Sequence, residues 1–293
     1  MTVADLDAVD RIYRVAFGTF VGAPDPQRFG GDTAFVPTRF AADPSGALVA
    51  EAEGRVVGSN FVADWGSVGF FGPLTVAPEL WDRGVGRSLL DATMDLFSAR
   101  GTRHAGLFTF SHSTKHISLY QRYGFWPRML TAIMAKPVAP ETAMAAEPPV
   151  VDLHAIGRLT DAVYPGLDLT REVESVQAQG LGAIVSVGED AVAICHVGPG
   201  SEAGSGHCYV KFGAVRPGPD ADRHFRLLLA ACERVAASQG AATLVAGVSA
   251  GCDRAWVAMR ESGFRPTMLG VAMHRPNDSG YHTSPNYVID DWR

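Results

Sequence analysis

The sequence has little excess charge and no long apolar run. Its formal net charge is −6 over 293 residues, and no cluster of lysine and arginine indicates a nucleic-acid surface. Its apolar stretches are shorter than the roughly 18 residues that a membrane-spanning helix needs. The first residues, Met1 to Asp7, lack the basic and apolar regions of a signal peptide. These absences predict a cytoplasmic protein that binds neither nucleic acid nor membrane.

Cysteine is also scarce. Only Cys195, Cys208, Cys232 and Cys252 are present, and they lie far apart, without the spacing of a metal site or of a disulfide framework. We therefore expect four buried thiols and no metal ion.

What the sequence does contain is a strand-to-helix segment, Leu74 to Leu90 (LTVAPELWDRGVGRSLL), with two glycines between arginines. Gly84 and Gly86 let the backbone approach an anion, and the unpaired N–H groups of the first helical turn point at it. The segment therefore predicts a phosphate site, although many such turns bind nothing. A nicotinamide site is a poor alternative, because no Gly-x-Gly-x-x-Gly follows a strand with an acid about 20 residues on.

A second motif lies downstream, in the segment Ser113 to Phe125 (STKHISLYQRYGF). Together the two motifs resemble the GNAT superfamily of acyl-CoA-dependent N-acetyltransferases. The signature Gln/Arg-x-x-Gly-x-Gly/Ala falls on residues 81–86, and Leu-Tyr-x-x-x-Gly-Phe falls on residues 119–125. Trp81 departs from the pattern, because the family usually has Gln or Arg there, which puts one side-chain contact to the pyrophosphate in doubt.

The resemblance implies acetyl-CoA as co-substrate, bound without a metal. The residues implied to contact it are Leu74, Thr75, Val76, Trp81, Asp82, Arg83, Gly84, Val85, Gly86, Arg87, Ser88, Ser113 and Tyr120. The backbone N–H groups of Leu74 and Val76 are expected beside the thioester, because in this family the fourth strand parts from the fifth. Ser113 is expected to cap a helix over 114–123.

Tyr120 occupies the family's general-acid position. A phenol with a pKa of about 10 protonates a thiolate of pKa near 8.5 at little cost. The alternative is that Tyr120 is a buried core aromatic, and Tyr123 is the weaker candidate for the acid.

No motif identifies the general base that would take the proton of the acceptor ammonium. His112 is the candidate we single out, since it follows the expected fifth strand, although a lone histidine is more often structural. Water could also remove the proton. The other candidates of this kind are His116, Glu51, Asp64 and Glu79.

The chain repeats itself at an offset of 139 residues. Val76 then matches Val215, and Gly124-Phe125 matches Gly263-Phe264, while the offset is 136 between Gly46 and Gly182. A fixed spacing over this length indicates a tandem duplication. The second copy reads Asp220-Ala-Asp-Arg-His-Phe-Arg226 opposite the glycine loop and has Met259 opposite Tyr120. We therefore expect it to keep the fold without the cofactor site.

The predicted fold class is α/β with a mixed sheet, in two tandem GNAT-like domains whose sheets are flanked by helices. The expected divisions are a catalytic domain over 1–137, a linker over 138–150, a degenerate domain over 151–276 and a tail over 277–293. In the first copy we expect helices over 4–17, 84–100 and 114–123, with a long loop over 20–44. Strands are expected over 47–52, 55–63, 71–76, 105–110 and 129–136, and almost no room remains for a strand before the first helix.

The predicted function is acetyl transfer from acetyl-CoA to a primary amine by the first copy. A non-catalytic acyl-CoA sensor and a structural tandem module are the alternatives. The acceptor is a small-molecule or peptide amine that the sequence does not identify, and the chain is expected to be a monomeric pseudo-dimer or a homodimer.

Overall fold

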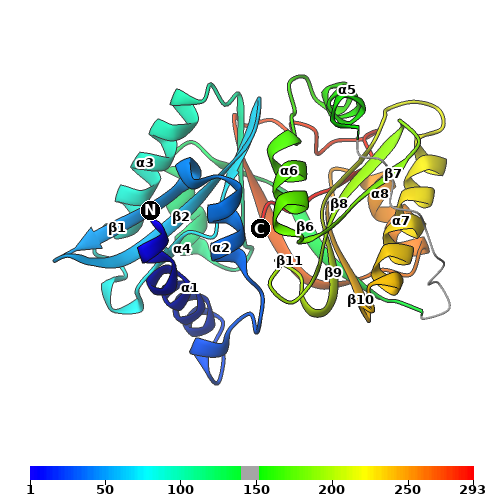
Figure 1. Ribbon diagram of the computed structural model, residues 1–293. Helices are drawn as coiled ribbons and strands as arrows, with labels where there is room; N and C mark the ends of the chain where they lie inside the picture. Colours follow the sequence, from blue (N-terminus) through cyan, green and yellow to red (C-terminus); the bar gives the residue numbers. More distant parts are fainter. Residues whose placement is uncertain (140–151) are drawn as a thin grey trace.

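The computed structural model describes residues 1–139 and 152–293, which we call the first and second halves. Figure 1 shows the halves side by side, the first in blue to green and the second in green to red. A twelve-stranded mixed sheet runs through both, in the order β1-β2-β3-β5-β11-β6-β10-β9-β8-β7, with β4 paired to β2 and β12 to β9. The mixed α/β fold class expected from the sequence is thus confirmed.

The elements of the first half are α1 (Leu6–Phe20), α2 (Phe35–Ala42), β1 (Ala47–Ala52), β2 (Arg55–Trp65), β3 (Val68–Phe71), β4 (Thr75–Val76), α3 (Val85–Ala99), β5 (His104–Phe110), α4 (Thr114–Gln121) and β6 (Trp126–Pro137). Short 3-10 helices add Val3–Asp5, Pro26–Arg28, Pro44–Gly46 and Pro78–Leu80. As expected, no strand precedes α1 in residues 1–5.

The elements of the second half are α5 (Leu153–Val163), α6 (Thr170–Gln179), β7 (Gly182–Val187), β8 (Ala191–Gly198), β9 (Gly204–Val215), α7 (Ala221–Ser238), β10 (Thr243–Ser249), α8 (Asp253–Glu261), β11 (Arg265–Arg275) and β12 (Val288–Ile289).

Helices cover both faces of the first half's sheet. Successive residues of a strand point to opposite faces, and on β2 Phe61 packs with Val9 of α1 and Val36 of α2. Its neighbour Val62 packs with Leu90 of α3 on the other face. The expected hairpin between β1 and β2 turns at Glu53 and Gly54, which both have positive φ, the backbone conformation that a tight two-residue turn needs.

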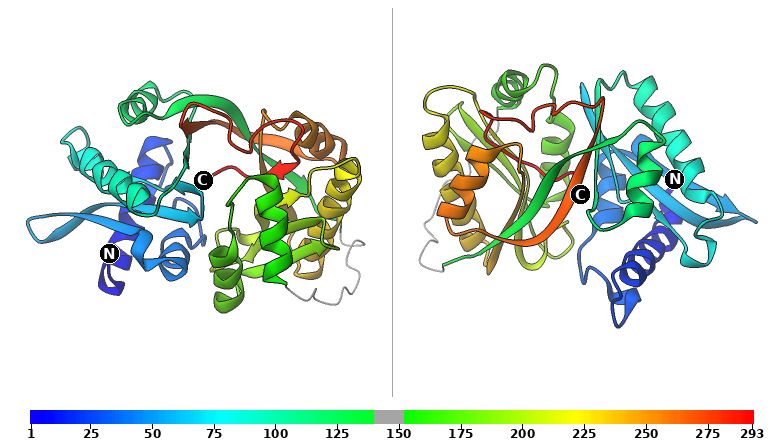
Figure 2. Two further views of the ribbon diagram at one scale, coloured as in Figure 1. Left: turned by 90° about the horizontal axis from the view of Figure 1, so that it is seen from above. Right: turned by 180° about the vertical axis from the view of Figure 1, so that it is seen from behind.

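The two halves exchange strands at the centre of the sheet. β6 lies between β10 and β11 of the second half, and β11 lies between β5 and β6 (Figure 2). Both exchanged ladders keep the offset of 139 residues, because Phe110 faces Gly270 and their counterparts Ser249 and Thr131 also face each other. Thr131 and Gly270 are themselves paired, so an approximate two-fold axis passes between them.

One expected strand is wrong. The segment 71–76 is divided, because β3 ends at Phe71 and the chain turns away through Gly72 before β4 begins at Thr75. β3 runs parallel to β5, whereas β4 pairs only with β2. The division produces the opening described below.

The expected tail over 277–293 packs against the protein. It contains β12 and several buried side chains, among them Tyr281, Ile289 and Trp292. Most of the expected linker 138–150 lies outside the described residues. The domain boundaries stay predictions, since each half contributes a strand to the other half's part of the sheet. All four cysteines are free and buried, as expected.

Candidate functional site

The first half contains a cleft between β4 and β5. The parallel pairing of β3 with β5 ends at Phe70 and Gly106, but β5 continues to Phe110. β4 has moved across to pair with β2 through Thr75 and Ser59. The two strands therefore part, as the resemblance implied, and leave backbone groups on either side without a strand partner.

The N–H groups of Leu74 and Val76 point into this cleft. Ala77 donates its N–H to the Val57 carbonyl of β2 at 2.9 Å, and Thr75 is paired with Ser59. Since N–H groups alternate in direction along a strand, those of Leu74 and Val76 point the other way, toward β5. Leu74 is half-buried, whereas Thr75 and Val76 are buried, so access is mainly to the backbone.

Trp81 contacts the same strand. Its indole nitrogen donates a hydrogen bond to the Val76 carbonyl at 2.8 Å. The side chain that departs from the family pattern thus stabilises β4 instead of extending toward an anion.

The first turn of α3 offers free N–H donors. Gly84 has the left-handed φ of 91° at the N-cap of the helix, and Asp82 also has positive φ. The first hydrogen bonds of this turn run from Arg87 and Ser88 to the Gly84 carbonyl. No partner is found among the described residues for the N–H groups of Gly84, Val85 and Gly86, the geometry of an anion site at a helix start.

The surface above this turn is open and basic. Arg83, Arg87 and Ser88 are exposed, and Lys115 at the start of α4 pairs with Asp82 at 2.7 Å between its Nζ and Oδ1. A Cβ at Gly86 would meet nothing closer than Leu74 and Val76 side-chain atoms at 3.9 Å. The glycine therefore keeps a surface clear that its own fold does not need.

Tyr120 lies on α4, in the core beneath the cleft. Its ring makes an edge-to-face contact with Phe71, with centroids 5.6 Å apart, and it is 7% exposed. Its hydroxyl has no hydrogen-bond partner among the described residues. Burial raises the pKa of the Tyr120 phenol well above its usual range, so the group stays protonated and able to donate.

Tyr123, the weaker acid candidate, is engaged elsewhere. Its hydroxyl donates to Asp91 at 2.8 Å, and burial together with this bond raises its pKa to about 12. It lies on the outer side of α3.

The expected side-chain cap by Ser113 is wrong. Ser113 is the N-cap residue of α4, but its hydroxyl makes no capping bond and contacts His116 Nδ1 at 2.8 Å instead. His116 in turn stacks on Tyr120, with centroids 6.4 Å apart. Burial, with a contribution from Lys115, lowers the pKa of His116, which favours the neutral imidazole that a base requires.

His112 is exposed and stacks on Phe20 of α1, with ring centroids 6.0 Å apart. Phe20 also contacts His116, at 5.1 Å, so the C-terminal end of α1 covers both histidines. Phe110 completes this aromatic group. The structure thus places His112 at the mouth of the cleft and His116 deeper, one helical turn from Tyr120.

The carboxylate candidates for the base are less well placed. Asp64 accepts a bond from the Gly66 N–H and lies 3.7 Å from Arg171. Glu51 and Glu79 are exposed.

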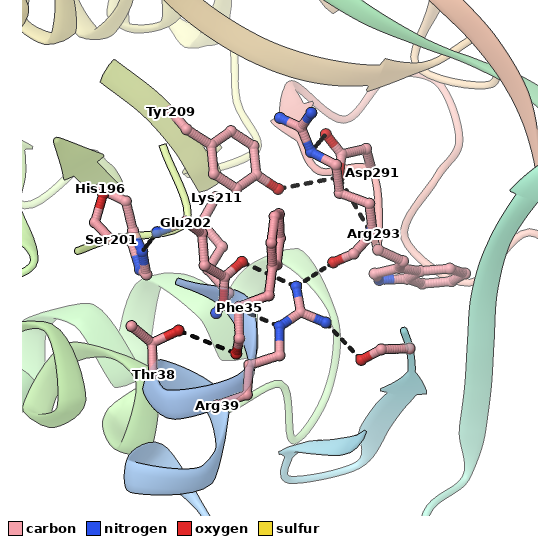
Figure 3. Close-up of polar contacts among 12 residues, drawn as sticks. Phe35, Thr38, Arg39, His196, Ser201, Glu202, Tyr209, Lys211, Asp291 and Arg293 are labelled. Carbon is pink, nitrogen blue, oxygen red and sulfur yellow. Dashed lines mark hydrogen bonds and ion pairs between the residues drawn. The ribbon is translucent and has the colours of Figure 1, made fainter. Parts of the chain in front are cut away.

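A buried ion cluster at the junction of the halves was not predicted. Arg39 of α2 makes two hydrogen bonds to Glu202, at 3.0 and 2.9 Å, and a third to the Gly72 carbonyl at 2.6 Å (Figure 3). Lys211 of β9 contacts Glu202 at 2.9 Å and Glu172 at 2.6 Å. These ions pair residues from both halves, so no local sequence pattern could reveal them. Their consequence is that the turn leading into β4 is held by the second half.

The second half lacks the features of the cleft. Met259, the counterpart of Tyr120, is fully buried, and the first turn of α7 carries Asp222.

The sequence and fold match acetyltransferases. The family model described as acetyltransferase (GNAT) family matches residues 7–125. A putative acetyltransferase from Pyrococcus horikoshii aligns with a TM-score of 0.70 at 14% identity, covering 100% of this chain and 93% of that one. A GCN5-related N-acetyltransferase from Sphaerobacter thermophilus aligns with 0.57 at 15% identity, covering 94% and 93%. One from Anabaena variabilis aligns with 0.53 at 14% identity, covering 96% and 72%.

At these identities the structural matches show the fold alone. No curated protein matches the sequence. Among the described residues, no helix has the length and apolarity required to cross a bilayer, and no group of His, Cys, Asp or Glu side chains is arranged to hold a metal.

Proposed function

Since residues 7–125 belong to the acetyltransferase (GNAT) family, we propose that the first half transfers an acetyl group from acetyl-CoA to a primary amine. The observation that carries the proposal is the cleft between β4 and β5. It combines the free N–H groups of Leu74 and Val76 with those at the start of α3, and Tyr120 lies beneath it.

The cleft fits the chemical groups of the co-substrate. The N–H groups of Gly84, Val85 and Gly86 would meet the pyrophosphate, with Arg83 and Arg87 adding charge-assisted bonds. Amide groups of an extended pantetheine arm would bond to β4 as a neighbouring strand does. Trp81 would act indirectly, by holding the Val76 carbonyl so that the Val76 N–H stays directed into the cleft.

In the reaction, the amine nitrogen bonds to the acyl carbon as the carbon–sulfur bond breaks. The N–H groups of Leu74 and Val76 stabilise the negative charge that develops on the acyl oxygen. Tyr120 donates its proton to the departing thiolate. The ammonium proton leaves through His116 or His112; of these, His116 is closer to Tyr120 and has the lowered pKa.

Two measurements on the whole chain test the proposal. Calorimetric titration with acetyl-CoA should give one site per chain, and a panel of amines should include at least one that releases free thiol. Binding without release against every amine would favour the non-catalytic sensor. Absence of any binding heat would refute both.

A further inference from the structure

The segment from Tyr281 to Trp292 is buried almost throughout, although it has little regular structure. The residues with at most 5% exposure are Tyr281, His282, Tyr287, Val288, Ile289, Asp290, Asp291 and Trp292. A loosely attached end would not bury three large aromatic side chains. The segment therefore occupies a formed site.

That site is the cleft between β9 and β10. The parallel pairing of these strands ends at Val210 and Ala246, and β12 enters the opening beyond it. β12 pairs with β9 through Ala214 and Gly213. On the other wall, the Asp290 N–H donates to the Gly247 carbonyl of β10 at 3.0 Å.

The cleft is the counterpart of the one in the first half. Val68 faces His104 in the first half, and their counterparts 139 residues later, His207 and Thr243, also face each other. By the same offset, Gly213 and Val215 correspond to Leu74 and Val76.

The buried segment takes the donor that the first half leaves free. The Val215 N–H donates to the Tyr287 carbonyl at 3.2 Å, whereas its counterpart at Val76 has no strand partner on that side. Ile289, two residues after Tyr287, is paired with Gly213, the counterpart of Leu74. A peptide strand thus satisfies the same two positions of the second cleft.

The resemblance extends to the phosphate end. Tyr287 donates its hydroxyl to Asp222 at 3.1 Å, and its ring packs on Phe225 with centroids 5.2 Å apart. By offset, these two residues replace Arg83 and Gly86. An acid and an aromatic ring accept a tyrosine where an arginine and a glycine would accept a phosphate.

At its other end the segment reaches the first half. The Trp292 ring covers Gly106 of β5 so closely that a Cβ there would lie 2.1 Å from it. The Arg293 guanidinium lies 4.0 Å from the Tyr209 ring centroid, and Arg39 donates to the Arg293 carbonyl (Figure 3). The segment therefore connects the second cleft to the junction of the halves.

We propose that the cleft between β9 and β10 is a peptide-binding site whose ligand is the chain's own segment Asn286–Arg293. The segment follows the path that the first half keeps for acetyl-CoA, and this comparison rests on the proposed function. The peptide site itself rests only on the contacts above. Its specificity is for an extended strand with tyrosine at the Asp222 end and tryptophan at the Gly106 end.

Hydrogen exchange on the full chain is the first test. The amides of Val215 and Asp290 should exchange at least 10³-fold more slowly than in an unstructured peptide, and at similar rates, because each closes one wall of the site. A full-length Ile289→Asn variant should lose this protection at both amides while β1 and β2 keep theirs. Rapid exchange in the parent chain, or unchanged protection in the variant, would overturn the proposal.

A second test supplies the segment separately. A chain without residues 286–293 should have a lower Tm and should bind the synthetic peptide NYVIDDWR, with recovery of Tm. The same peptide with serine in place of Tyr287 and asparagine in place of Ile289 is the control and should not bind. A shortened chain with unchanged Tm and no peptide binding would contradict the proposal.

Acetyl-CoA binding separates the two hypotheses. Loss of all acetyl-CoA binding would refute the proposed function and leave the peptide result intact. Two acetyl-CoA molecules per full-length chain would instead overturn the peptide site, because the second cleft would then be free.

Discussion

Trp81 donates its indole N–H to the Val76 carbonyl at 2.8 Å. The bond joins the loop before α3 to the short strand β4, the two parts of the cleft that would contact opposite ends of the co-substrate. A residue that breaks the family's sequence pattern thus has a position of its own in the cleft.

Replacing Trp81 by phenylalanine keeps the ring and removes this bond. A single hydrogen bond contributes about 0.5–1.5 kcal/mol, so the Kd for acetyl-CoA should rise by up to roughly tenfold. Calorimetry measures it. Trp126→Phe is the matched control, since Trp126 is 50% exposed at the start of β6, and its Kd should not change. Equal values for both variants would show that Trp81 does not position β4.

Gly86→Phe reproduces in the first half the residue that stands at Phe225 in the second. The fold should accept it, because the nearest atoms to a Cβ there are at ordinary contact distance. The aromatic ring should cover the first turn of α3 and abolish acetyl-CoA binding with little change in Tm. Gly157→Ala, on a helix with nothing near its Cβ, is the control. Normal affinity in Gly86→Phe would refute the phosphate site.

Tyr120→Phe should lower kcat and leave acetyl-CoA affinity unchanged, because the hydroxyl has no structural partner. The loss of an acid amounts to roughly 10² to 10⁴, and we expect the lower end, since a thiolate leaves readily. Tyr123→Phe should retain the parent rate. A Tyr120→Phe enzyme with full activity would show that the ring is only part of the core.

Stability should fall in mild acid because of a buried histidine pair. His104 Nε2 lies 3.0 Å from His274 Nδ1, and burial lowers the pKa of His104 to about 4 and that of His274 to about 2. Both rings are therefore neutral in the folded state, while the unfolded chain takes up protons below pH of about 6.5. The stability present above that pH is lost as the pH falls toward 4, by on the order of 3 kcal/mol for His104.

Urea unfolding between pH 7.5 and 5 measures this effect. His274→Gln should reduce the dependence on pH, because one of the two groups no longer titrates. The exposed His154→Gln should keep the parent dependence. A midpoint independent of pH in the parent chain would contradict the assignment.

Arg39→Met should both destabilise the protein and slow its reaction. Breaking a buried ion pair costs about 3–5 kcal/mol, and Arg39 also holds the Gly72 carbonyl before β4. The double variant Arg39→Met with Glu202→Gln should regain stability without regaining kcat. Recovery of both together would show that the cluster acts only on stability.

Local patterns predicted most of the first half. The period of α1, the turn at Glu53-Gly54 and the glycine loop before α3 are written in neighbouring residues, and their elements lie within a few residues of the expected bounds. The division of the strand over 71–76 was missed, because β-type residues continue on both sides of Gly72. Ser113 has the residue type of a helix cap, but a histidine three residues later competes for its hydroxyl.

Contacts between distant segments could not be predicted in this way. The Arg39–Glu202 pair joins residues 163 positions apart, and neither has a neighbour that indicates the other. The duplication was legible as an offset, yet the exchange of β6 and β11 was not, because each strand has the same apolar pattern whichever sheet it joins.

This exchange constrains the order in which the protein can fold during synthesis. β5 is made early but pairs on one side with β11, which ends at Arg275. β6 likewise has to wait for β10. The catalytic half therefore cannot complete its sheet on the ribosome until nearly the whole chain has been translated, and its open strand edges are exposed to aggregation or chaperone binding until then.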